Sequence, residues 1–282
     1  MSGYAIFHAA DRPCRELNMS WFLSIVIPSY NEEKRIRPSL DAVLRFLEKQ
    51  DYLAEVIVVD DGSSDGTART VAERIPEYGK GGHELRVLTN KPNRGKGYSV
   101  KRGLTDAKGE IVIFSDADFS SPITEAPKLI DPIVQGRADV TLGSRALNRD
   151  MIGVHQPRMR EFGGMVFNLC MRAITGLKLR DTQCGFKAFR REAALPVFAL
   201  QRVERFGFDA EVLYIAKKQG NRLLEIPVVW NHCEGGELQG KMNYIRDSIN
   251  MFADLIRIRV NDWRGRYQNP ATGATTGQYN KR

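Results

Sequence analysis

Residues 23–62, LSIVIPSYNEEKRIRPSLDAVLRFLEKQDYLAEVIVVDDG, contain the pattern that decides the fold. The apolar runs 23–27 and 55–59 are typical of buried strands, and Pro28 ends the first of them. Between the two runs, apolar residues recur at helical spacing over residues 35–49. A strand, a helix and a second strand in this order predict two parallel strands joined by a crossover helix.

The same alternation continues through the first half of the chain. Strands are predicted at 85–88, 111–114 and 139–142, and helices at 67–75, 97–107 and 124–135. This pattern predicts an α/β fold with a mostly parallel sheet and helices on both faces. Ligands of such sheets bind beyond the carboxyl ends of the strands.

The second half of the chain is less regular. Helices are predicted at 160–174 and 208–219, and Pro227 interrupts a strand predicted at 223–230, as is typical of a sheet edge. From Met242 onward, helical spacing predicts a C-terminal helix of about five turns. The predicted apolar face of that helix consists of Ile245, Ile249, Phe252, Ile256 and Val260.

Charge and composition limit the possible partners. The chain has 282 residues, with 42 Lys and Arg against 34 Asp and Glu, which gives a formal net charge of +8. An excess of basic residues favours anionic partners, namely nucleic acid, a phosphate-bearing substrate or an acidic membrane surface. Because 42% of the residues are hydrophobic, the chain can build a core, which excludes disorder for most of its length.

The sequence also excludes several classes of protein. No stretch approaches about 18 consecutive apolar residues, so we expect no transmembrane helix. Charged residues interrupt the first twenty positions, where a signal peptide needs an apolar core: Asp11, Arg12, Arg15 and Glu16. The four cysteines form no C-x-x-C pair, which argues against a zinc module and a disulfide framework: Cys14, Cys170, Cys184 and Cys233. We therefore expect a reducing, cytoplasmic location.

Acidic loops follow three of the predicted strands. Asp116-Ala117-Asp118 comes directly after the run 111–114, and two carboxylates at this spacing can hold a divalent cation together with a substrate diphosphate. The alternative for this motif is a solvated turn. The loop 60–66, DDGSSDG, contains Asp61, which can accept hydrogen bonds from a nucleobase or ribose.

Part of the loop 60–66 is also explained by an Asx turn and a helix cap, with Asp65 as the cap. In the third loop, 28–33 (PSYNEE), Tyr30 can stack on a base and Glu32 can accept a hydrogen bond. A strand-to-helix turn capped by Asn31 is the alternative. All three loops are expected at one edge of one sheet, and neither a dinucleotide fingerprint nor a P-loop is present to explain them.

Five segments, taken in order, resemble family 2 glycosyltransferases of the GT-A fold. They are SIVIPSYNEE (24–33), VVDDGSSDGT (58–67), NRGKG (93–97), SDAD (115–118) and GSR (143–145). The resemblance extends over residues 22–260 and is greatest with the polyprenyl-phosphate hexosyltransferases, namely dolichyl-phosphate β-glucosyltransferase and dolichol-phosphate mannose synthase. The segments DTQCGFK (181–187) and FDAE (208–211) resemble the glucosyltransferase branch.

The resemblance implies roles for individual residues. The nucleotide-sugar donor would be bound by Pro28, Tyr30, Glu32, Asp61, Lys96, Asp116, Ala117 and Lys241. Asp118 would ligate Mg²⁺ or Mn²⁺ directly, with Asp116 beside it, and these two residues and Arg145 would carry the catalysis. Arg145 and Arg160 would contact the acceptor phosphate, with Arg158 as a competitor for the second position.

The sequence departs from the family pattern at two positions. Ser120 stands where the mannose synthases commonly have Gln, which leaves the remaining metal ligand open. Residues 239–241 are Gln-Gly-Lys where Gly-Ser-Lys is usual, which leaves the register of Lys241 open. The expected organisation is an N-terminal extension (1–21), a GT-A-like domain (22–232), an active-site loop with an amphipathic helix (233–264) and a disordered tail (265–282).

Charge gives a separate argument about the acceptor. A lipid phosphate is already anionic, so it needs positioning by a fork-shaped donor such as Arg145 more than it needs a general base. A sugar hydroxyl would need a carboxylate base, for which Asp181, Asp209 and Glu211 are candidates. Helix capping or pairing with Arg180 or Lys187 is the alternative role of those carboxylates.

We therefore expect a metal-dependent, inverting transfer of a hexose, glucose from UDP-glucose, to a polyprenyl phosphate. The alternatives are mannose transfer from GDP-mannose, transfer to a soluble or glycan hydroxyl, and a nucleotide-sugar-binding regulatory module without catalysis. A basic stretch at 86–102 without an acid favours a donor-side or membrane-facing patch over nucleic acid. The arginines at 257–266 allow either a core-packed helix with a solvated face or a segment that contacts a membrane. We expect no nucleic-acid partner, and peripheral contact with the cytoplasmic face of a membrane or with a membrane protein.

Overall fold

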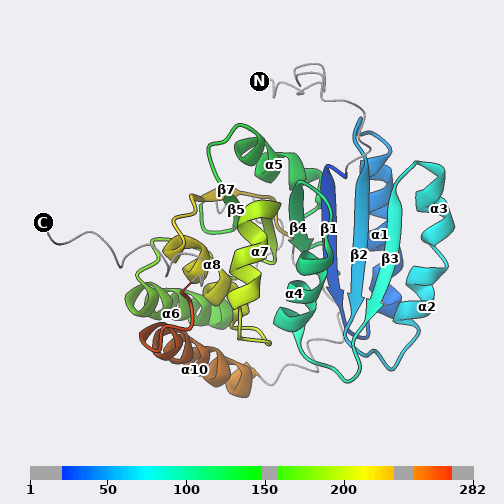
Figure 1. The fold of residues 1–282 in the computed structure, drawn as a ribbon. Coiled ribbons are helices and arrows are strands. Elements are labelled where there is room, and N and C mark those ends of the chain that lie inside the picture. The colour runs from blue at the N-terminus through cyan, green and yellow to red at the C-terminus, as the bar shows by residue number, and fades with distance from the viewer. Residues whose placement is uncertain (1–20, 148–157, 232–243, 269–282) are drawn as a thin grey trace, which may run out of the picture.

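The structure is a computed structural model, and it describes residues 21–147, 158–231 and 244–268. Within these residues, seven strands form one sheet in the order β3-β2-β1-β4-β6-β5-β7 (Figure 1). They are β1 (Leu23–Ser29), β2 (Ala54–Asp60), β3 (Glu84–Thr89), β4 (Ile111–Ser115), β5 (Val140–Ser144), β6 (Phe186–Arg190) and β7 (Leu223–Pro227). Every apolar run that was predicted to be a strand is one, and β7 is an edge strand as predicted.

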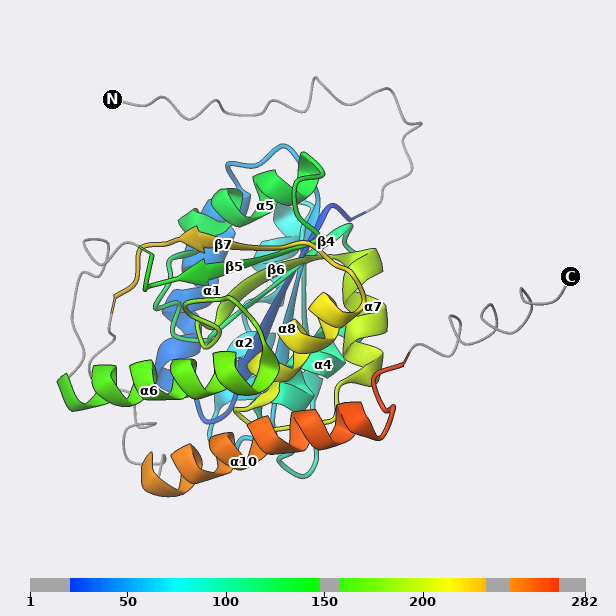
Figure 2. The ribbon, with the colours of Figure 1, turned by 90° about the vertical axis from the view of Figure 1, so that its left-hand side faces the viewer.

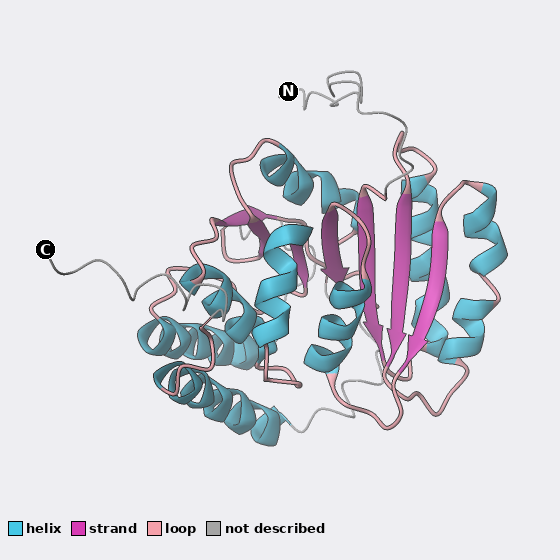
Figure 3. Ribbon diagram, viewed as in Figure 1, coloured by secondary structure: helices cyan, strands magenta, loops and turns pink. Residues whose placement is uncertain are grey.

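Helices cover both faces of the sheet (Figures 2 and 3). Alternate residues of a strand point to opposite faces, so Val26 and Ile25 of β1 belong to two separate apolar clusters. Val26 faces α4 (Lys96–Asp106), α6 (Arg158–Thr175), α7 (Arg191–Leu200), α8 (Phe208–Lys218) and α10 (Tyr244–Trp263). Ile25 faces α1 (Glu33–Leu47), α2 (Thr67–Ala72), α3 (Ile75–Lys80), the short helix η2 (Ile123–Glu125) and α5 (Ala126–Val134). The predicted fold class is confirmed.

Two parts of this architecture differ from the sequence prediction. The helix predicted at 67–75 is two helices, α2 and α3, because Pro76 lies in the first turn of α3 and cannot continue a preceding helix. β6 and α7 were not predicted. β6 is antiparallel to both β4 and β5, and its sequence FKAFR places a buried lysine in the centre of the sheet, which breaks the apolar pattern of a central strand.

One edge of the sheet gathers the loops that the sequence singled out. β1, β2, β3, β4, β5 and β7 run in one direction, and the arrowheads of β1 to β3 point to this edge in Figure 1. Because β6 is antiparallel, it begins where its neighbours end. The segment before β6 therefore joins the loops that follow β1, β2, β4 and β5.

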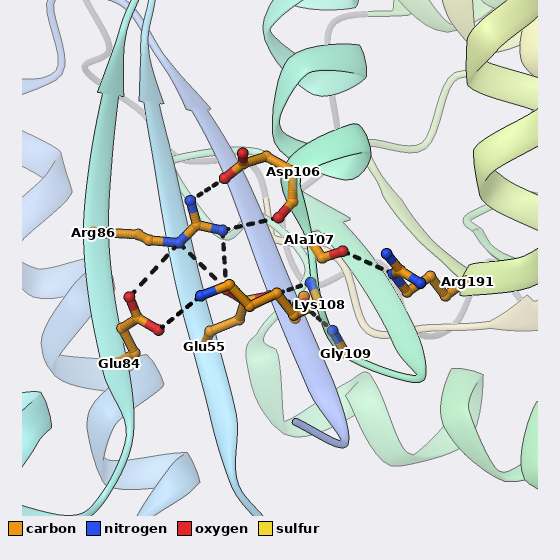
Figure 4. Close-up of polar contacts among 9 residues, drawn as sticks. Glu55, Glu84, Arg86, Asp106, Ala107, Lys108, Gly109 and Arg191 are labelled. Carbon is orange, nitrogen blue, oxygen red and sulfur yellow. Dashed lines mark hydrogen bonds and ion pairs between the residues drawn. The ribbon is translucent and has the colours of Figure 1, made fainter. Parts of the chain in front are cut away.

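The opposite edge contains a buried acidic side chain (Figure 4). Glu55, near the start of β2, is fully buried and accepts hydrogen bonds from Ser24 Oγ (2.6 Å), the backbone N–H of Lys108 (2.5 Å) and Arg86 Nη2 (3.0 Å). Arg86 also binds Asp106 at the end of α4. These contacts close the α4–β4 turn on the strands beside it.

The basic stretch 86–102 therefore does not form one patch. Arg86 contacts groups at the edge of the sheet opposite the acidic loops, whereas other basic residues of this stretch bind groups near those loops. Arg102 donates to the carbonyl of Thr89 (2.7 Å), and Lys101 donates to the carbonyl of Gln201 (2.9 Å). Arg94 pairs with Glu204 at 2.5 Å. Most of these charges thus stabilise local structure.

The C-terminal part of the described chain is anchored to the core. After α10, Tyr267 is buried and donates a hydrogen bond from its hydroxyl to Glu211 of α8 (2.5 Å). The sequence prediction placed Tyr267 in a disordered tail, but its ring packs within the larger apolar cluster. Residues 1–20 of the predicted N-terminal extension (1–21) and the rest of the predicted tail, 269–282, lie outside the described residues.

No helix in the described ranges has the length and apolar character that a membrane span requires. Cys170 and Cys184 are free thiols, and Cys14 and Cys233 lie outside the described residues. Burial raises the pKa of Cys184 to about 11, so its thiol stays protonated at neutral pH.

Candidate active site

Polar contacts lock together the loops that follow β1 and β2. Asn31 has a left-handed backbone (φ +54°), which asparagine tolerates better than most residues. Its side-chain oxygen accepts the backbone N–H of Ser64 (2.8 Å), and Glu33 accepts the backbone N–H of Gly66 (3.1 Å). Asn31 therefore holds the neighbouring loop instead of capping α1. The N-cap of α2 is Gly66 and not Asp65, so the predicted cap is wrong by one residue; the Asp65 carboxylate accepts the backbone N–H of Thr67 at 3.0 Å, as in the predicted Asx turn.

The residues predicted to form the nucleotide pocket lie at this edge of the sheet, but they differ in how far they are exposed to solvent. Tyr30 is 39% exposed, so a base can reach its ring. Glu32 is buried and binds Arg35 through both carboxylate oxygens, at 2.7 and 2.6 Å. Pro28 is a buried residue of β1, so its ring is not exposed at this edge.

Asp61 is buried and organises the loop that follows β3. Its carboxylate accepts hydrogen bonds from the side chain of Asn90 (2.7 Å) and from the backbone N–H groups of Arg94 (3.0 Å) and Gly95 (2.7 Å). Gly95 has a positive φ of 106°, and Lys96 begins α4 directly after it. Asp61 therefore fixes the entry into α4 and the position of Lys96, whatever further contact it makes with a nucleotide.

Asp116, at the end of β4, lies between two other segments of the edge. Its backbone N–H donates to the carbonyl of Gly185 (3.1 Å), just before β6. Its carboxylate oxygen Oδ1 lies 2.5 Å from Nζ of Lys96. The structure thus brings together two of the predicted donor-binding residues, from α4 and from the β4 loop.

The rest of the β4 loop is a tight turn. The Asp118 carboxylate accepts the backbone N–H of Ser120 (3.0 Å), and Phe119 between them has a positive φ of 45°. Ala117 is buried, and its carbonyl accepts a hydrogen bond from the hydroxyl of Ser39 on α1 (2.6 Å). Asn31 and Phe119 are the non-glycine residues of the described ranges with positive φ, and both lie in these loops, where such backbone strain is typical of functional sites.

The charge of Lys96 is favoured by its surroundings. Burial alone would lower the pKa of this ammonium group, but the nearby carboxylates, Asp116 foremost and then Asp209, outweigh it and raise the pKa. Lys96 therefore stays a cation at neutral pH. A cation at the N-terminal end of α4 suits a site that binds a diphosphate.

Arg145 follows β5 and forms a bidentate ion pair with Asp181. Its Nε and Nη2 donate to the two carboxylate oxygens at 2.7 and 2.8 Å, and its backbone N–H donates to the same side chain at 3.0 Å. Burial alone would lower the pKa of Arg145, but the Asp181 carboxylate outweighs it and raises the pKa. The guanidinium lies over the Trp230 ring, 5.4 Å from its centroid, so its plane is fixed.

The three carboxylates that the sequence offered as a general base all have partners within the protein. Asp181 binds Arg145, and Asp209 binds Lys187 at 2.5 Å. Glu211 accepts the backbone N–H groups of residues 202 and 203, at 2.9 and 2.7 Å, in addition to the Tyr267 hydroxyl. Burial raises the pKa of Glu211 and of Asp209 despite these partners.

Two predicted site residues cannot be placed. Lys241 lies outside the described residues. Arg160 belongs to α6, but its side chain, like that of Arg158, is not described. Their contacts with donor and acceptor stay predictions.

Comparison with known proteins identifies the family. Residues 24–198 match the family model "Glycosyl transferase family 2". The chain belongs to this family. It is therefore a glycosyltransferase, and the loops at the sheet edge are its candidate active site.

Named relatives match over most of the glycosyltransferase chain. Dolichyl-phosphate β-glucosyltransferase of Homo sapiens is 36% identical over 258 residues, which covers 86% of this chain and 77% of the relative. The enzyme of that name from Saccharomyces cerevisiae is 36% identical over 268 residues, covering 88% and 77%. Glucosyl-3-phosphoglycerate synthase from Mycobacterium tuberculosis, solved with Mn²⁺ and UDP, has the same fold, with a TM-score of 0.59, 21% identity and coverage of 88% and 85%.

The donor set of this glycosyltransferase fits a hard divalent cation. Asp116 and Asp118 supply carboxylate oxygens, and the Asp116 side chain is 39% exposed, so it can be reached. No group of three or more His, Cys, Asp or Glu side chains in the described ranges could hold a metal ion. A cation here would therefore complete its coordination with water and donor phosphate, as Mg²⁺ commonly does.

Sequence reasoning missed two residues that shape this site: Asn90 contacts Asp61, and Gly185 contacts Asp116. Pairing with Lys187 was the alternative role that the sequence allowed for these carboxylates, and it is confirmed for Asp209. The segment DTQCGFK resembled the family, but it was not interpreted as part of the metal side. The available signal was Lys187 itself, a charged residue within the otherwise apolar run 186–189 (FKAF).

Proposed function

We propose that this glycosyltransferase transfers glucose from UDP-glucose to a polyprenyl phosphate such as dolichyl phosphate, with inversion and with Mg²⁺ or Mn²⁺. Human and yeast relatives of 36% identity bear the name dolichyl-phosphate β-glucosyltransferase, which supports this sugar and this acceptor. Those names favour glucose over the alternative, mannose from GDP-mannose. The Mn²⁺ and UDP bound by a protein of the same fold support the metal and the nucleotide.

One observation carries the choice of acceptor. Asp181, Asp209 and Glu211 are all committed to partners in the protein, so none of them is poised to deprotonate a sugar hydroxyl. A phosphate acceptor is already anionic and needs no such base. The geometry therefore favours a phosphate over a soluble or glycan hydroxyl.

Arg145 is suited to hold the acceptor phosphate. Asp181 takes its Nε and one Nη group and fixes the guanidinium plane, while the remaining N–H groups can donate to an anion. The side chain is 29% exposed, so a phosphate from outside can reach it. A lysine at this position has its three N–H groups on one nitrogen, so it would lose the planar, bidentate contact with Asp181.

The reaction then requires little covalent chemistry from the protein. An oxygen of the acceptor phosphate attacks the anomeric carbon, and the bond from that carbon to the UDP oxygen breaks, with its electron pair leaving on UDP. Lys96 and the cation held by Asp116 and Asp118 would balance the charge that develops on the diphosphate. Attack from the side opposite the leaving group inverts the anomeric carbon.

We further propose that α10 and α6 contact the cytoplasmic face of an anionic membrane. Of the large apolar side chains that the described residues expose, several lie on these two adjacent helices (Figure 2): Val166, Leu169, Ile249, Ile256 and Trp263. Arginines line a hollow of about 550 Å³ beside this α10 stripe: Arg202, Arg257, Arg264 and Arg266. Exposed apolar groups flanked by arginines suit a bilayer interface with acidic headgroups.

A donor screen with polyprenyl phosphate tests the proposed function. We expect UDP-glucose with Mg²⁺ or Mn²⁺ to give a lipid product whose mass is increased by one hexose, and removal of the cation with a chelator to abolish it. Asp118→Ala should also abolish turnover, because it removes a proposed ligand.

Three other outcomes would contradict the proposal or one part of it. Glucosylation of a soluble hydroxyl without lipid would select the other acceptor class, and Asp209→Asn would then be the variant to compare. Binding of UDP without turnover on any acceptor would indicate a regulatory module. GDP-mannose as the preferred donor would overturn the choice of sugar alone.

A further inference from the structure

A buried ion pair in the centre of the sheet has no place in the proposed chemistry. Lys187 of β6 is fully buried, in register with Phe114 of β4 and Leu142 of β5. Its Nζ donates to Asp209 Oδ1 (2.5 Å) and to the carbonyl of Cys184 (2.6 Å). Burying two charges costs several kcal/mol of desolvation per ion, and apolar residues of similar size would often stabilise a fold as well. Stability alone is therefore a weak explanation for this pair.

Lys187 fixes the backbone of residues 184–185, which lies on one side of Asp116. By binding the Cys184 carbonyl, it holds the segment that ends at Gly185. The carbonyl of Gly185 accepts the backbone N–H of Asp116 (3.1 Å). The carboxylate also packs on this glycine, since a Cβ there would lie 2.1 Å from Asp116 Oδ2. A side chain at this position would therefore displace the Asp116 carboxylate.

Asp209 belongs to α8, which packs against the helix that carries Lys96 on the other side of Asp116. Lys96 Nζ lies 2.5 Å from the second carboxylate oxygen of Asp116. The first turn of α4, which carries Lys96, packs directly on the first turn of α8, because a Cβ at Gly97 would lie 2.7 Å from the Cβ of Phe208. Asp209 follows Phe208, so the pair links the backbone on one side of Asp116 to the helix contact on the other.

We propose that Lys187 and Asp209 are positioning residues for the metal side of the active site. Together they hold the Asp116 carboxylate between Gly185 and Lys96, in the orientation that it needs beside Asp118 to take a cation and the donor diphosphate. The effect on turnover rests on the proposed function, whereas the effect on cation binding does not.

The test removes both charges at once, in the double variant Lys187→Met/Asp209→Asn, so that no unpaired charge stays buried. Mn²⁺ binding is measured by calorimetry without donor or acceptor, and thermal unfolding is measured in parallel. We expect a folded protein with Mn²⁺ affinity weakened by about tenfold, the range typical when a residue that orients a metal ligand is removed. With both substrates, kcat should fall while the KM for the lipid acceptor stays the same.

Another buried ion pair provides the matched control. Arg86→Met/Glu55→Gln removes the charges at the opposite edge of the sheet, which contact no residue of the candidate site. This variant should lose thermal stability but keep the Mn²⁺ affinity of the unaltered protein. Equal losses of Mn²⁺ affinity in the two double variants would indicate a general structural effect and overturn the proposal.

A second variant covers the case in which the first double variant does not fold. Gly185→Ala places a methyl group against the Asp116 carboxylate, on the side that Lys187 holds, and we expect the same loss of Mn²⁺ affinity. Unchanged Mn²⁺ binding in either folded variant would overturn the proposal. Because Mn²⁺ binding is measured without substrate, a failure to find a lipid product would not contradict the positioning role of Lys187 and Asp209.

Discussion

At the scale of single residues, the site is built from side chains that already have partners. Asp61 uses three hydrogen bonds to hold the loop before α4, and Asp181 holds the guanidinium of Arg145 in one plane. A carboxylate that accepts several hydrogen bonds loses most of its freedom to turn, so its neighbours are fixed before any substrate binds. Preorganisation of this kind suits a reaction that depends on positioning more than on proton transfer.

Arg145→Lys tests this positioning at one residue. Lysine keeps the positive charge, but it cannot bind Asp181 through two N–H groups and a phosphate through others. We expect kcat/KM for the polyprenyl phosphate to fall by roughly 100-fold, in line with loss of a charged hydrogen bond. Calorimetry with UDP should give an unchanged affinity; a larger loss in UDP binding than in acceptor use would refute this role for Arg145.

At the scale of elements, ion pairs at the sheet edges tie strands to the turns beside them. Asp139, just before β5, binds Arg222, just before β7, through both carboxylate oxygens at 2.9 Å each. The hydrogen bond from Arg222 is the main cause that lowers the pKa of Asp139 to about 2, against its ordinary value of 3.8. This pair therefore joins the edge strand β7 to the rest of the sheet.

The pH dependence of unfolding tests this clamp. Because the pKa of Asp139 is lower in the folded state, its stabilising effect is present above pH 3.8 and is lost as the pH falls towards about 2. Asp139→Asn should be less stable than the unaltered protein at neutral pH, and the difference in unfolding free energy should shrink over that window. Urea unfolding at several pH values measures this difference in unfolding free energy. A difference that grows as the pH falls would contradict the stabilising role of the Asp139 carboxylate.

The element that departs most from its predicted role is α10. The sequence placed Ile249 and Ile256 on a single apolar face, but Leu255 and Ile258 pack into the core, while Ile249 and Ile256 are 63% and 55% exposed. Ile245 is part of the helix, but its side chain is not described. The helix thus has an inner apolar stripe that holds it to α6 and α8 and an outer one that faces away.

At the scale of the whole molecule, vesicle binding tests whether the outer stripe contacts a membrane. Each exposed apolar side chain that enters a bilayer contributes about 1 kcal/mol. Ile249→Ser/Ile256→Ser/Trp263→Ser should therefore weaken co-sedimentation with phosphatidylserine vesicles by roughly 100-fold. Binding should also decrease at high salt, because the flanking arginines are screened.

Exposed apolar residues elsewhere give the control for that experiment. Ile75→Ser/Val134→Ser removes side chains that are 39% and 52% exposed on α3 and α5, away from α10. This variant should bind vesicles like the unaltered protein. Equal binding by all three proteins would exclude the α10 stripe as the membrane contact.

Elements whose pattern is local could be predicted from the amino-acid sequence alone. The runs at 23–27 and 55–59 are strands because consecutive β-branched residues bury both faces of a central strand, and the acidic loops follow from where those strands end. The fold class, the family resemblance and the edge that contains Asp61, Asp116 and Asp118 could all be predicted in this way.

Features that join distant segments arise from tertiary packing. β6 contains a charged residue where a central strand is usually apolar, and the carboxylate that pairs with this buried lysine is Asp209, 22 positions further along the chain. Arg86 and Arg94 are close in sequence but lie toward different edges of the sheet, because Arg86 is near the start of β3 and Arg94 comes after its end. Local patterns report burial and periodicity, whereas the partners of a buried charge are set by how the elements pack, which no single stretch of sequence contains.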